Sequence, residues 1–217
     1  MINCLFCGKN IEDKAHYGLH KHCFKQIFGV SSIGYFQDWQ RKESVSKDAP
    51  HQPDKPYLSS FFAGNYSKYE AVLLDTRYIF KLGNKNCPEL APVEYLCNLI
   101  GKKLGIPVPE PFALIQGNED LSFVTKNFTQ NISGHHNLIH LYHYLPAGEN
   151  HYNVKNILEV IGKETQSPED VRIFLEVLIF DSLIGNHDRH GRNLALLETA
   201  AGKRLAPIYD NTSALGL

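Results

Sequence analysis

A set of side chains that could carry out phosphoryl transfer follows in order along the second half of the chain. Asp188 and Asn193 stand five residues apart in the polar run HDRHGRN, and Asp210 ends the apolar run LAPIYD. Phosphoryl transfer needs a cation on the nucleotide phosphates, oxygen ligands for Mg²⁺ and a carboxylate that faces the acceptor hydroxyl. Because Mg²⁺ prefers hard oxygen donors, Asn193 and Asp210 are candidate metal ligands, and Asp188 is the candidate catalytic base.

The candidate cation is Lys81, which interrupts the apolar, strand-like run YIFKLG. Glu94, early in the next predicted helix, is its expected ion-pair partner. Protein kinases also carry the phosphate-pairing lysine on a strand, and they separate the catalytic Asp from the metal-binding Asn by the same spacing. A lone strand lysine is often a solvated edge charge, and an Asp in such a loop is often a turn former. The joint order of these residues favours a kinase-like site.

The elements that must position these residues follow from the apolar patterns. The runs AVLLD and RYIFKLG predict a β-hairpin with its turn at residues 75–77. Residues 91–104 predict a helix with one apolar face, and PFALIQGNEDLSFVTKNF predicts two strands joined at Gly117 and Asn118. Residues 129–153 are expected to form a long loop with some helix. The upstream half is therefore a sheet with one helix.

Downstream, the run SPEDVRIFLEVLIFDSLIG predicts a helix that begins at Pro168. Ser167 can cap it, and Glu169 and Asp170 favour the positive end of its dipole. Its apolar residues lie nearly all round, which predicts a buried helix. LALL and LAPIYD predict a second hairpin, joined by ETAAGKR, with Asp210 at the end of its second strand. The polar loop is thus expected between a buried helix and a hairpin.

The run FDSLIGNHDRHGRNLALL, followed by LAPIYDNTSAL, resembles the signature of the HipA-type serine/threonine kinase toxins, from about residue 57 to the end. This resemblance implies that Asp188 is the catalytic base, that Asn193 and Asp210 hold Mg²⁺, and that Lys81 contacts ATP. His190 also fits the family's catalytic loop. From its order along the chain, the strand LSFVTKNF is expected to contribute the hinge that hydrogen-bonds adenine, with its contact residues in the stretch 124–128: Val124, Lys126 and Phe128.

The family also has a glycine-containing phosphate loop, and its expected counterpart here is SSFFAGNYSKYEA. Gly64 would let backbone amides approach an anion beside Asn65, and Lys68 would supply a point charge. This stretch lacks the Gln-x-Lys sequence of the family. An ordinary polar hairpin turn is the alternative interpretation.

In these kinases a serine before the loop can be autophosphorylated. Ser59 and Ser60 are the first candidates here, and Ser67 is the second. A phosphate added there would repel the phosphates of ATP, so the modification is expected to be inhibitory.

The expected fold is α+β and two-lobed, with the architecture of a protein kinase. Four segments are predicted: a Cys/His-containing segment over 1–30, a linker over 31–56, a mostly β N-lobe over 57–130 and the start of a helical C-lobe over 131–217. The chain stops seven residues after Asp210, whereas HipA-like kinases continue into a substantial helical lobe. The end of that lobe is therefore expected to be missing.

The first thirty residues contain a second candidate site, Cys4-x-x-Cys7 followed by His20-x-x-Cys23. A Cys₃His set with these spacings suits tetrahedral Zn²⁺, and a small segment with little core of its own gains most from such a metal. His22 or His16 could replace His20, and the cysteines could instead be buried thiols. Any zinc here is expected to be structural.

Composition narrows the classes of function. The formal net charge is -1, with 22 Lys+Arg against 23 Asp+Glu, so direct binding to nucleic acid is not expected. No apolar run approaches the roughly twenty residues that span a bilayer, and the first residues do not form a signal sequence. An odd number of scattered cysteines suits a reducing compartment. These features predict a cytoplasmic protein.

The family resemblance also implies partners. The short N-terminal segment resembles the arrangement in the shorter HipT-type kinases, whose missing N-terminal piece is a separate small protein. The expected substrate is a serine or threonine on a component of the bacterial translation machinery, such as an aminoacyl-tRNA synthetase. A cognate antitoxin, which can bind DNA, is the expected regulatory partner.

Two alternatives remain at this stage. An HD-type phosphohydrolase would use His187 and Asp188 with Asp210 and some of the histidines His135, His136, His140 and His143. Such folds are all-helical, and Asn193 would have no role in them. A catalytically silent kinase-like module that binds partners is the second alternative.

Overall fold

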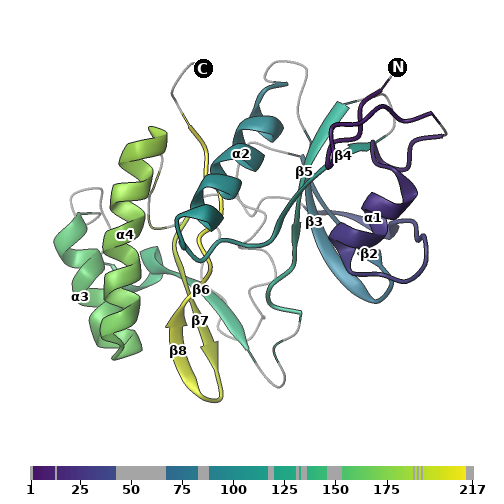
Figure 1. Cartoon of the computed structure of the whole chain (residues 1–217). Coiled ribbons are helices and arrows are strands. Elements are labelled where there is room, and N and C mark those ends of the chain that lie inside the picture. Colours follow the sequence, from purple (N-terminus) through teal and green to yellow (C-terminus); the bar gives the residue numbers. More distant parts are fainter. Residues whose placement is uncertain are drawn as a thin grey trace.

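The computed structural model describes residues 2–12, 14–42, 67–82, 88–116, 120–130, 132, 136–145, 153–187, 189, 191 and 193–213. Within these ranges it contains two antiparallel sheets and four α-helices, arranged in two lobes (Figure 1). The first lobe holds a five-stranded sheet in the order β1-β2-β3-β5-β4. The second holds helices α3 and α4 beside a three-stranded sheet in the order β6-β7-β8. The predicted α+β, two-lobed architecture is confirmed.

The five-stranded sheet contains both predicted strand pairs. Its strands are β1 (Gln37–Lys42), β2 (Ser67–Leu73), β3 (Thr76–Leu82), β4 (Pro111–Gln116) and β5 (Asp120–Lys126). Leu74 and Asp75 join β2 to β3 with φ angles of 45° and 64°. Positive φ at both central residues is the backbone of the tight turns that match strand twist. The predicted first helix is α2 (Leu90–Lys103), and it packs against β4 and β5.

Side chains on successive residues of these strands alternate between the two faces of the sheet. One face buries Tyr78 and Phe80 of β3 together with Val124 of β5 in a single apolar cluster. The opposite face carries Lys81 and Phe123, which line a pocket. The sheet therefore has one apolar face and one face with polar and ionisable groups.

The N-terminal segment covers the apolar face. Leu19, Cys23 and Phe24, on and before helix α1 (Lys21–Phe28), belong to the same buried cluster as the sheet residues. Phe28 stacks on Phe112 of β4 with ring centroids 4.6 Å apart. The segment is thus an integral part of the first lobe, with no separate core.

The structure contradicts the predicted linker at Gln37–Lys42, because these residues form strand β1 and pair with β2. The run is polar since β1 is an edge strand. Its one large apolar side chain, Trp39, packs on Phe80 with ring centroids 4.6 Å apart. A polar composition of this kind therefore does not distinguish a linker from an edge strand.

The second lobe contains a helix and a strand that the sequence analysis did not identify. Helix α3 (Val154–Thr165) begins at Asn153, whose side chain accepts a hydrogen bond from the Asn156 amide. Strand β6 (Asn137–His140), followed by the short 3₁₀ helix Leu141–Tyr144, lies in the predicted long loop and pairs with β7. β6 is only four residues long, so its sequence carries almost no periodic signal.

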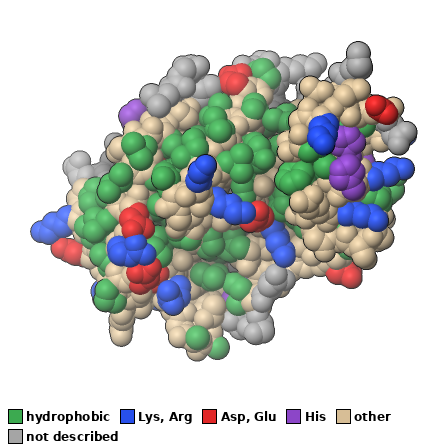
Figure 2. Space-filling model, viewed as in Figure 1, with side chains coloured by type: hydrophobic (Ala, Val, Ile, Leu, Met, Phe, Trp, Pro, Cys, Tyr) green, Lys and Arg blue, Asp and Glu red, His purple; other side chains and the backbone are tan. Residues whose placement is uncertain are grey.

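Helix α4 (Pro168–Ile184) begins and ends as its sequence predicts. The Ser167 side chain accepts a hydrogen bond from the Asp170 amide, and Gly185 ends the helix with a φ of 66°. The expectation that α4 is buried all round is wrong, because Leu175, Ile179 and Leu183 are exposed. Figure 2 shows apolar side chains gathered over α2 and α4 on one face of the molecule. Among the described residues, no helix is both long and apolar enough to cross a membrane.

A hairpin is present here, as β7 (Ala195–Thr199) and β8 (Gly202–Leu205), but its second strand lies in the predicted connection ETAAGKR and shares only Leu205 with the predicted strand LAPIYD. Asp210, however, does not end a strand. The chain leaves β8 after Leu205 and runs back toward the first lobe, where the Ile208 amide donates to the Pro107 carbonyl at 2.7 Å. Asp210 itself has a φ of 54°. This return segment brings a carboxylate of the second lobe up to the sheet of the first.

Candidate active site

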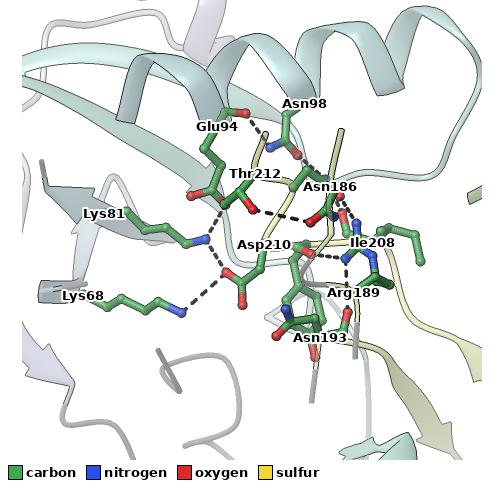
Figure 3. Close-up of polar contacts among 12 residues, drawn as sticks. Lys68, Lys81, Glu94, Asn98, Asn186, Arg189, Asn193, Ile208, Asp210 and Thr212 are labelled. Carbon is green, nitrogen blue, oxygen red and sulfur yellow. Dashed lines mark hydrogen bonds and ion pairs between the residues drawn. The ribbon is translucent and has the colours of Figure 1, made fainter. Parts of the chain in front are cut away.

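The centre of the candidate site is an ion-pair cluster formed by Lys68, Lys81, Glu94 and Asp210, drawn in Figure 3. The Lys81 ammonium donates hydrogen bonds to Glu94 Oε1 and to Asp210 Oδ1. Lys68 reaches the same Asp210 oxygen at 3.5 Å. Strands β2 and β3, helix α2 and the return segment each contribute one of these residues. The predicted Lys81–Glu94 pair is therefore present, and Asp210 joins it.

The cluster is almost completely removed from water. Lys68 and Glu94 are each 1% exposed, whereas the Asp210 side chain keeps 17% of its surface. Buried charges persist only when opposite charges and hydrogen bonds compensate their desolvation. Lys81 and Asp210 are compensated in this way, whereas burial lowers the pKa of Lys68 and raises the pKa of Glu94. Removal of one charged member is therefore costly.

The pKa shifts follow from burial and from the charges in this cluster. Burial would raise the pKa of Asp210, but the ammonium groups of Lys68 and Lys81 hold that pKa well below its ordinary value. Burial would lower the pKa of Lys81, but Asp210 and Glu94 raise it above its ordinary value. Asp210 is therefore ionised and Lys81 protonated at neutral pH, as an acidic metal ligand and a phosphate-binding cation require.

Glu94 is held in place from its own helix. Asn98, one turn later on α2, donates to the Glu94 carbonyl at 2.8 Å, and the Asn98 side-chain oxygen accepts from Asn211 at 3.0 Å. Glu94 Oε2 is buried and makes no hydrogen bond among the described residues. Because an unsatisfied buried carboxylate oxygen is costly, this oxygen marks a place where a further cation or donor would stabilise the site.

A second polar cluster, which the sequence analysis missed, is built around Arg189. Its guanidinium forms two hydrogen bonds with Asp181 of α4, at 2.8 and 2.9 Å. It also donates to the Tyr209 carbonyl at 2.8 Å and to the Asn211 side chain at 2.6 Å. One buried side chain thus joins α4, the polar loop and the return segment on both sides of Asp210.

Asn186 belongs to the same cluster, because its side-chain amide donates to Asp181 Oδ1 at 2.8 Å. A signal for this cluster was present in the sequence. Asp181 is an acidic residue inside the apolar run of α4, and a buried carboxylate requires a partner. The sequence did not indicate which of the nearby basic residues is that partner.

Asn193, the other predicted magnesium ligand, lies close to the return segment (Figure 3). Its backbone carbonyl accepts a hydrogen bond from Arg189 at 3.4 Å, and the same guanidinium binds the carbonyl that precedes Asp210. Arg189 therefore holds the segments of Asn193 and Asp210 next to each other, as a shared metal corner requires.

A small, partly open pocket lies beside the ion-pair cluster. Its lining includes Lys81, Glu94 and Asp210, together with the side chains Ile79, Asn98, Pro109, Phe123, Thr125 and Tyr209. The site therefore combines apolar walls with a charged end, which suits a ligand that has both a flat apolar part and an anionic part.

The pocket corrects one predicted nucleotide contact. Val124 is fully buried on the opposite face of the sheet, and its strand pairs with β3 on one side and β4 on the other. Its side chain does not face the pocket, because alternation along β5 directs Phe123 and Thr125 there instead. Lys126 ends β5, and Phe128 follows it and packs against Tyr209 with ring centroids 6.5 Å apart. These two residues remain predicted nucleotide contacts.

Several predicted residues lie outside the part of the chain that the structure describes. They are the catalytic-loop residues Asp188 and His190 and the phosphate-loop residues Ser59, Ser60, Gly64 and Asn65. Ser67 is described only in its backbone, at the start of β2. Lys68, the next residue, is the one predicted phosphate-loop side chain that the structure places, and it contacts Asp210.

The N-terminal cysteines and histidine also come together. The ligand atoms of Cys4, Cys7, His20 and Cys23 all lie within 4.8 Å of one another. This cluster lies on the N-terminal segment, which covers the face of the sheet opposite the pocket. The Cys/His cluster and the ion-pair cluster thus lie on opposite sides of the same sheet.

The hydrolase alternative is contradicted by the fold, because HD-type folds are all-helical and this molecule contains two antiparallel sheets. Its proposed histidine ligands are also used differently. His140 is buried, and its Nδ1 lies 3.2 Å from the Tyr209 hydroxyl. Within the described ranges, the N-terminal Cys/His set is the one group of three or more His, Cys, Asp and Glu residues that lie close enough together to hold a metal.

Comparisons with known proteins agree with this geometry. Residues 55–216, most of the chain, match the HipA-like C-terminal domain. The chain belongs to the HipA-like C-terminal domain family. A relative from Sinorhizobium fredii (strain NBRC 101917 / NGR234), named "Putative kinase Y4mE", is 34% identical over 65 residues, which are 30% of this chain and 16% of that protein.

Two solved structures resemble the fold. The Helicobacter pylori proinflammatory kinase CtkA superposes with a TM-score of 0.57 at 23% identity, over 69% of this chain and 55% of that protein. HipA of Shewanella oneidensis MR-1, solved with HipB and operator DNA, superposes with a TM-score of 0.52 at 18% identity, over 82% of this chain and 51% of HipA. The chain therefore has a kinase-like fold, and it spans about half the length of these two proteins.

Proposed function

We propose that this chain is an ATP- and Mg²⁺-dependent serine/threonine protein kinase that acts as a toxin in the bacterial cytoplasm. The observation that carries the proposal is the junction of Lys81, Glu94 and Asp210 at the charged end of a pocket. These residues come from a strand, a helix and the return segment, and their order matches that of the phosphate-binding lysine, its glutamate and the metal-binding aspartate of kinases.

The residues present fit both ATP and magnesium. Asp210 is ionised and partly exposed, and Asn193 lies on the neighbouring segment, so these two offer the hard oxygen donors that Mg²⁺ prefers. When bound, the metal would neutralise phosphate charge. Lys81 and Lys68 would hold the phosphates, and Phe123 and Thr125 would contact the base within the pocket.

Asp188 would accept the proton of the acceptor hydroxyl, with His190 beside it in the same loop. Arg189, between these two residues, is anchored by Asp181 and Asn211 and would set the position of the loop. A general base in hydrogen-bond reach of its substrate typically contributes about 10²–10⁴-fold to the rate.

The substrate and partners are proposed from the family. HipA of Shewanella oneidensis was solved with HipB and DNA, which supports a small antitoxin, itself bound to DNA, as the regulatory partner of this chain. A translation component, such as an aminoacyl-tRNA synthetase, is the proposed protein substrate. Autophosphorylation at Ser59, Ser60 or Ser67 would place negative charge near Lys68 and Lys81, where the phosphates of ATP would bind. Repulsion between these charges would inhibit ATP binding.

Incubation of the purified chain with γ-labelled ATP and Mg²⁺, followed by intact mass and peptide mapping, tests the proposal. Phosphate is expected in the wild type and absent from Asp188→Asn and Asp210→Asn. A panel of purified aminoacyl-tRNA synthetases in the same assay tests the substrate.

Equal phosphate transfer by these variants would show that the assigned roles are wrong. If the wild type transfers none but its melting temperature still rises with ATP, the chain is a silent nucleotide-binding module. If ATP has no effect on melting, the site does not bind nucleotide.

A further inference from the structure

The N-terminal segment lies outside the region matched to the family, which begins at residue 55. Its Cys/His cluster has no role in the proposed phosphotransfer, since it lies on the other side of the sheet from the pocket. Cys4 and Cys23 are buried, Cys7 is exposed and His20 is half-buried. A solvent-facing edge of this kind allows an ion to enter.

The first two cysteines lie on a tight turn. The Gly8 amide donates to the Cys4 carbonyl at 2.9 Å, and the Cys4 amide donates to the Lys9 carbonyl, also at 2.9 Å. Gly8 has a φ of 71°, a conformation that glycine adopts at no steric cost. The backbone therefore folds back immediately after Cys7, and both thiols of the Cys-x-x-Cys pair face the same ion-sized space.

The second pair lies at the start of helix α1. His20 is the N-cap residue, and Cys23 lies in the first turn of the helix. The Leu5 amide donates to the Gly18 carbonyl at 3.0 Å, which joins the turn between the cysteines to the residues just before His20. Backbone hydrogen bonds thus assemble the site from both sides, so its geometry does not depend on the side chains alone.

The distances around His20 suit a metal ligand. Its Nδ1 lies 3.4 Å from Cys7 Sγ and 3.8 Å from Cys23 Sγ. Zn–S bonds of about 2.3 Å and Zn–N bonds of about 2.0–2.1 Å at tetrahedral angles place sulfur and nitrogen about 3.6 Å apart. His20 Nε2 lies 3.0 Å from the Asn10 carbonyl. A proton on Nε2 would leave the Nδ1 lone pair free for an ion, as in zinc-binding histidines whose other ring N–H donates to a carbonyl.

The structure also distinguishes among the three nearby histidines. His16 is buried, its Nε2 lies 2.8 Å from the Gly34 carbonyl, and its ring packs edge-on against Phe24. His22 is exposed and stacks on the outer side of His20, with ring centroids 5.1 Å apart. His20 is therefore the fourth ligand, and Figure 2 shows histidine side chains at the surface of this segment.

We propose that Cys4, Cys7, His20 and Cys23 bind one structural Zn²⁺ that orders the N-terminal segment, which covers the apolar face of the five-stranded sheet. Four protein ligands leave no open position for substrate, so the site is structural. The buried ligands Cys4 and Cys23 belong to the same apolar cluster as Phe80 of β3. Metal binding would therefore stabilise the first lobe itself.

The physical need for the metal follows from the size of the segment. Between residues 2 and 30 the structure has one eight-residue helix and otherwise only isolated bridges and turns. Such a segment buries too little apolar surface to order itself, and in small metal domains the energy of metal binding is energy of folding. Without the ion, the segment is expected to loosen and to uncover the aromatic face of the sheet.

The test begins with metal analysis of the full chain, purified under reducing conditions without chelator. One zinc per chain is expected. Replacement by Co²⁺ should give the visible absorption of a tetrahedral cobalt–thiolate site. A strong chelator should lower the melting temperature by at least about 5 °C and increase the fluorescence of a dye that binds exposed apolar surface.

Cys7→Ser and His20→Ala are the informative variants, because these side chains are not in the buried core and the variants are expected to fold. Each should lose most of the zinc. His22→Ala and Cys97→Ala are the controls, since His22 is not a ligand and Cys97 is buried in the core of the other lobe. Both controls should retain one zinc per chain.

Three results would overturn the proposal. The first is a wild-type chain with no stoichiometric zinc that also takes up no Co²⁺. The second is full zinc content in Cys7→Ser. The third is a mass two hydrogens lower that reverts with reductant, which would show a disulfide in place of the metal site. None of these measurements uses phosphotransfer, so a result that refutes the zinc proposal leaves the kinase proposal unaffected.

Discussion

The two polar clusters on opposite sides of the five-stranded sheet are assembled in different ways. The Cys/His cluster takes all its ligand atoms from residues 4–23, held by local turns and one helix start. The ion-pair cluster joins Lys68 to Asp210, 142 residues away, and Lys81 to Asp210, 129 residues away. The first cluster consists of thiols and an imidazole, and the proposed zinc would be its only opposite charge. The second already contains the opposite charges it needs.

This difference predicts how the stability of each cluster responds to the loss of one of its components. A site made of thiols and an imidazole loses its stabilising energy when the ion leaves, but each ligand can remain neutral. A buried cluster of fixed charges cannot lose one member without leaving another uncompensated, which typically costs about 3–5 kcal/mol. The following predictions are ordered from the largest expected effect to the smallest.

Lys81→Met should give the largest effect, because it leaves Glu94 and Asp210 buried without their shared cation. Phosphate transfer should fall at least about 100-fold, since electrostatic stabilisation of the phosphates is lost. The ATP-induced rise in melting temperature should disappear, while the zinc content stays unchanged. Lys102→Met is the matched control, because Lys102 is exposed and pairs with Glu110 at the surface. Normal ATP binding by Lys81→Met would refute the assignment.

Arg189→Ala should destabilise the fold strongly. The guanidinium and Asp181 are both less than a tenth exposed, so the variant leaves a buried carboxylate without its cation. A loss of about 3–5 kcal/mol in the free energy of unfolding is expected from urea titration. Arg172→Ala is the control, because Arg172 pairs with Glu169 and Glu176 in solvent and should change little. Similar losses of unfolding free energy in both variants would show that burial of the Arg189–Asp181 pair does not determine its contribution to stability.

The ion-pair cluster should also produce a characteristic pH dependence. The folded-state pKa of Asp210 is lowered, so its contribution to stability is present above its unfolded pKa and is lost as the pH falls through the acid range. Stability measured from pH 6 down to pH 3 should therefore decline more steeply in the wild type than in Asp210→Asn. Both proteins keep the same Cys/His cluster, so its own acid sensitivity cancels in the comparison. If stability declines equally steeply with falling pH in both proteins, the neighbouring lysines do not lower the folded-state pKa of Asp210.

The smallest expected effect is the energetic coupling between the two clusters. They occupy opposite sides of the sheet and share no described contact, so the destabilisations caused by Lys81→Met and Cys7→Ser should add within about 0.5 kcal/mol. Unfolding of the two single variants and the double variant would measure the difference. A larger coupling would mean that the zinc-held segment adjusts the nucleotide face through the strands between them.

Local features were the part that sequence reasoning predicted well. The turn after β2 and the cap of α4 at Ser167 depend on residues within a few positions of one another. The order of Lys81, Glu94 and Asp210 also indicated the site, because the site needs those residue types on those kinds of element. Glu94 could be named as the partner of Lys81 since kinases pair a strand lysine with the following helix.

Tertiary structure alone decided the rest. The composition of Gln37–Lys42 is typical of a linker, and only its pairing with β2 shows that it is a strand. The sequence of α4 predicts a buried helix, and only the packing of the fold shows that Ile179 is exposed. Val124 and Phe123 are adjacent in the chain, yet only the pairing of β5 between two strands shows which one faces the pocket. Arg189 could have paired with several carboxylates, and the fold places it against Asp181 and against the Tyr209 carbonyl beside Asp210. The sequence by itself determined which residues could do the chemistry and how each local element begins and ends. Packing decided which of them meet, because burial and charge compensation act between residues that the chain keeps far apart.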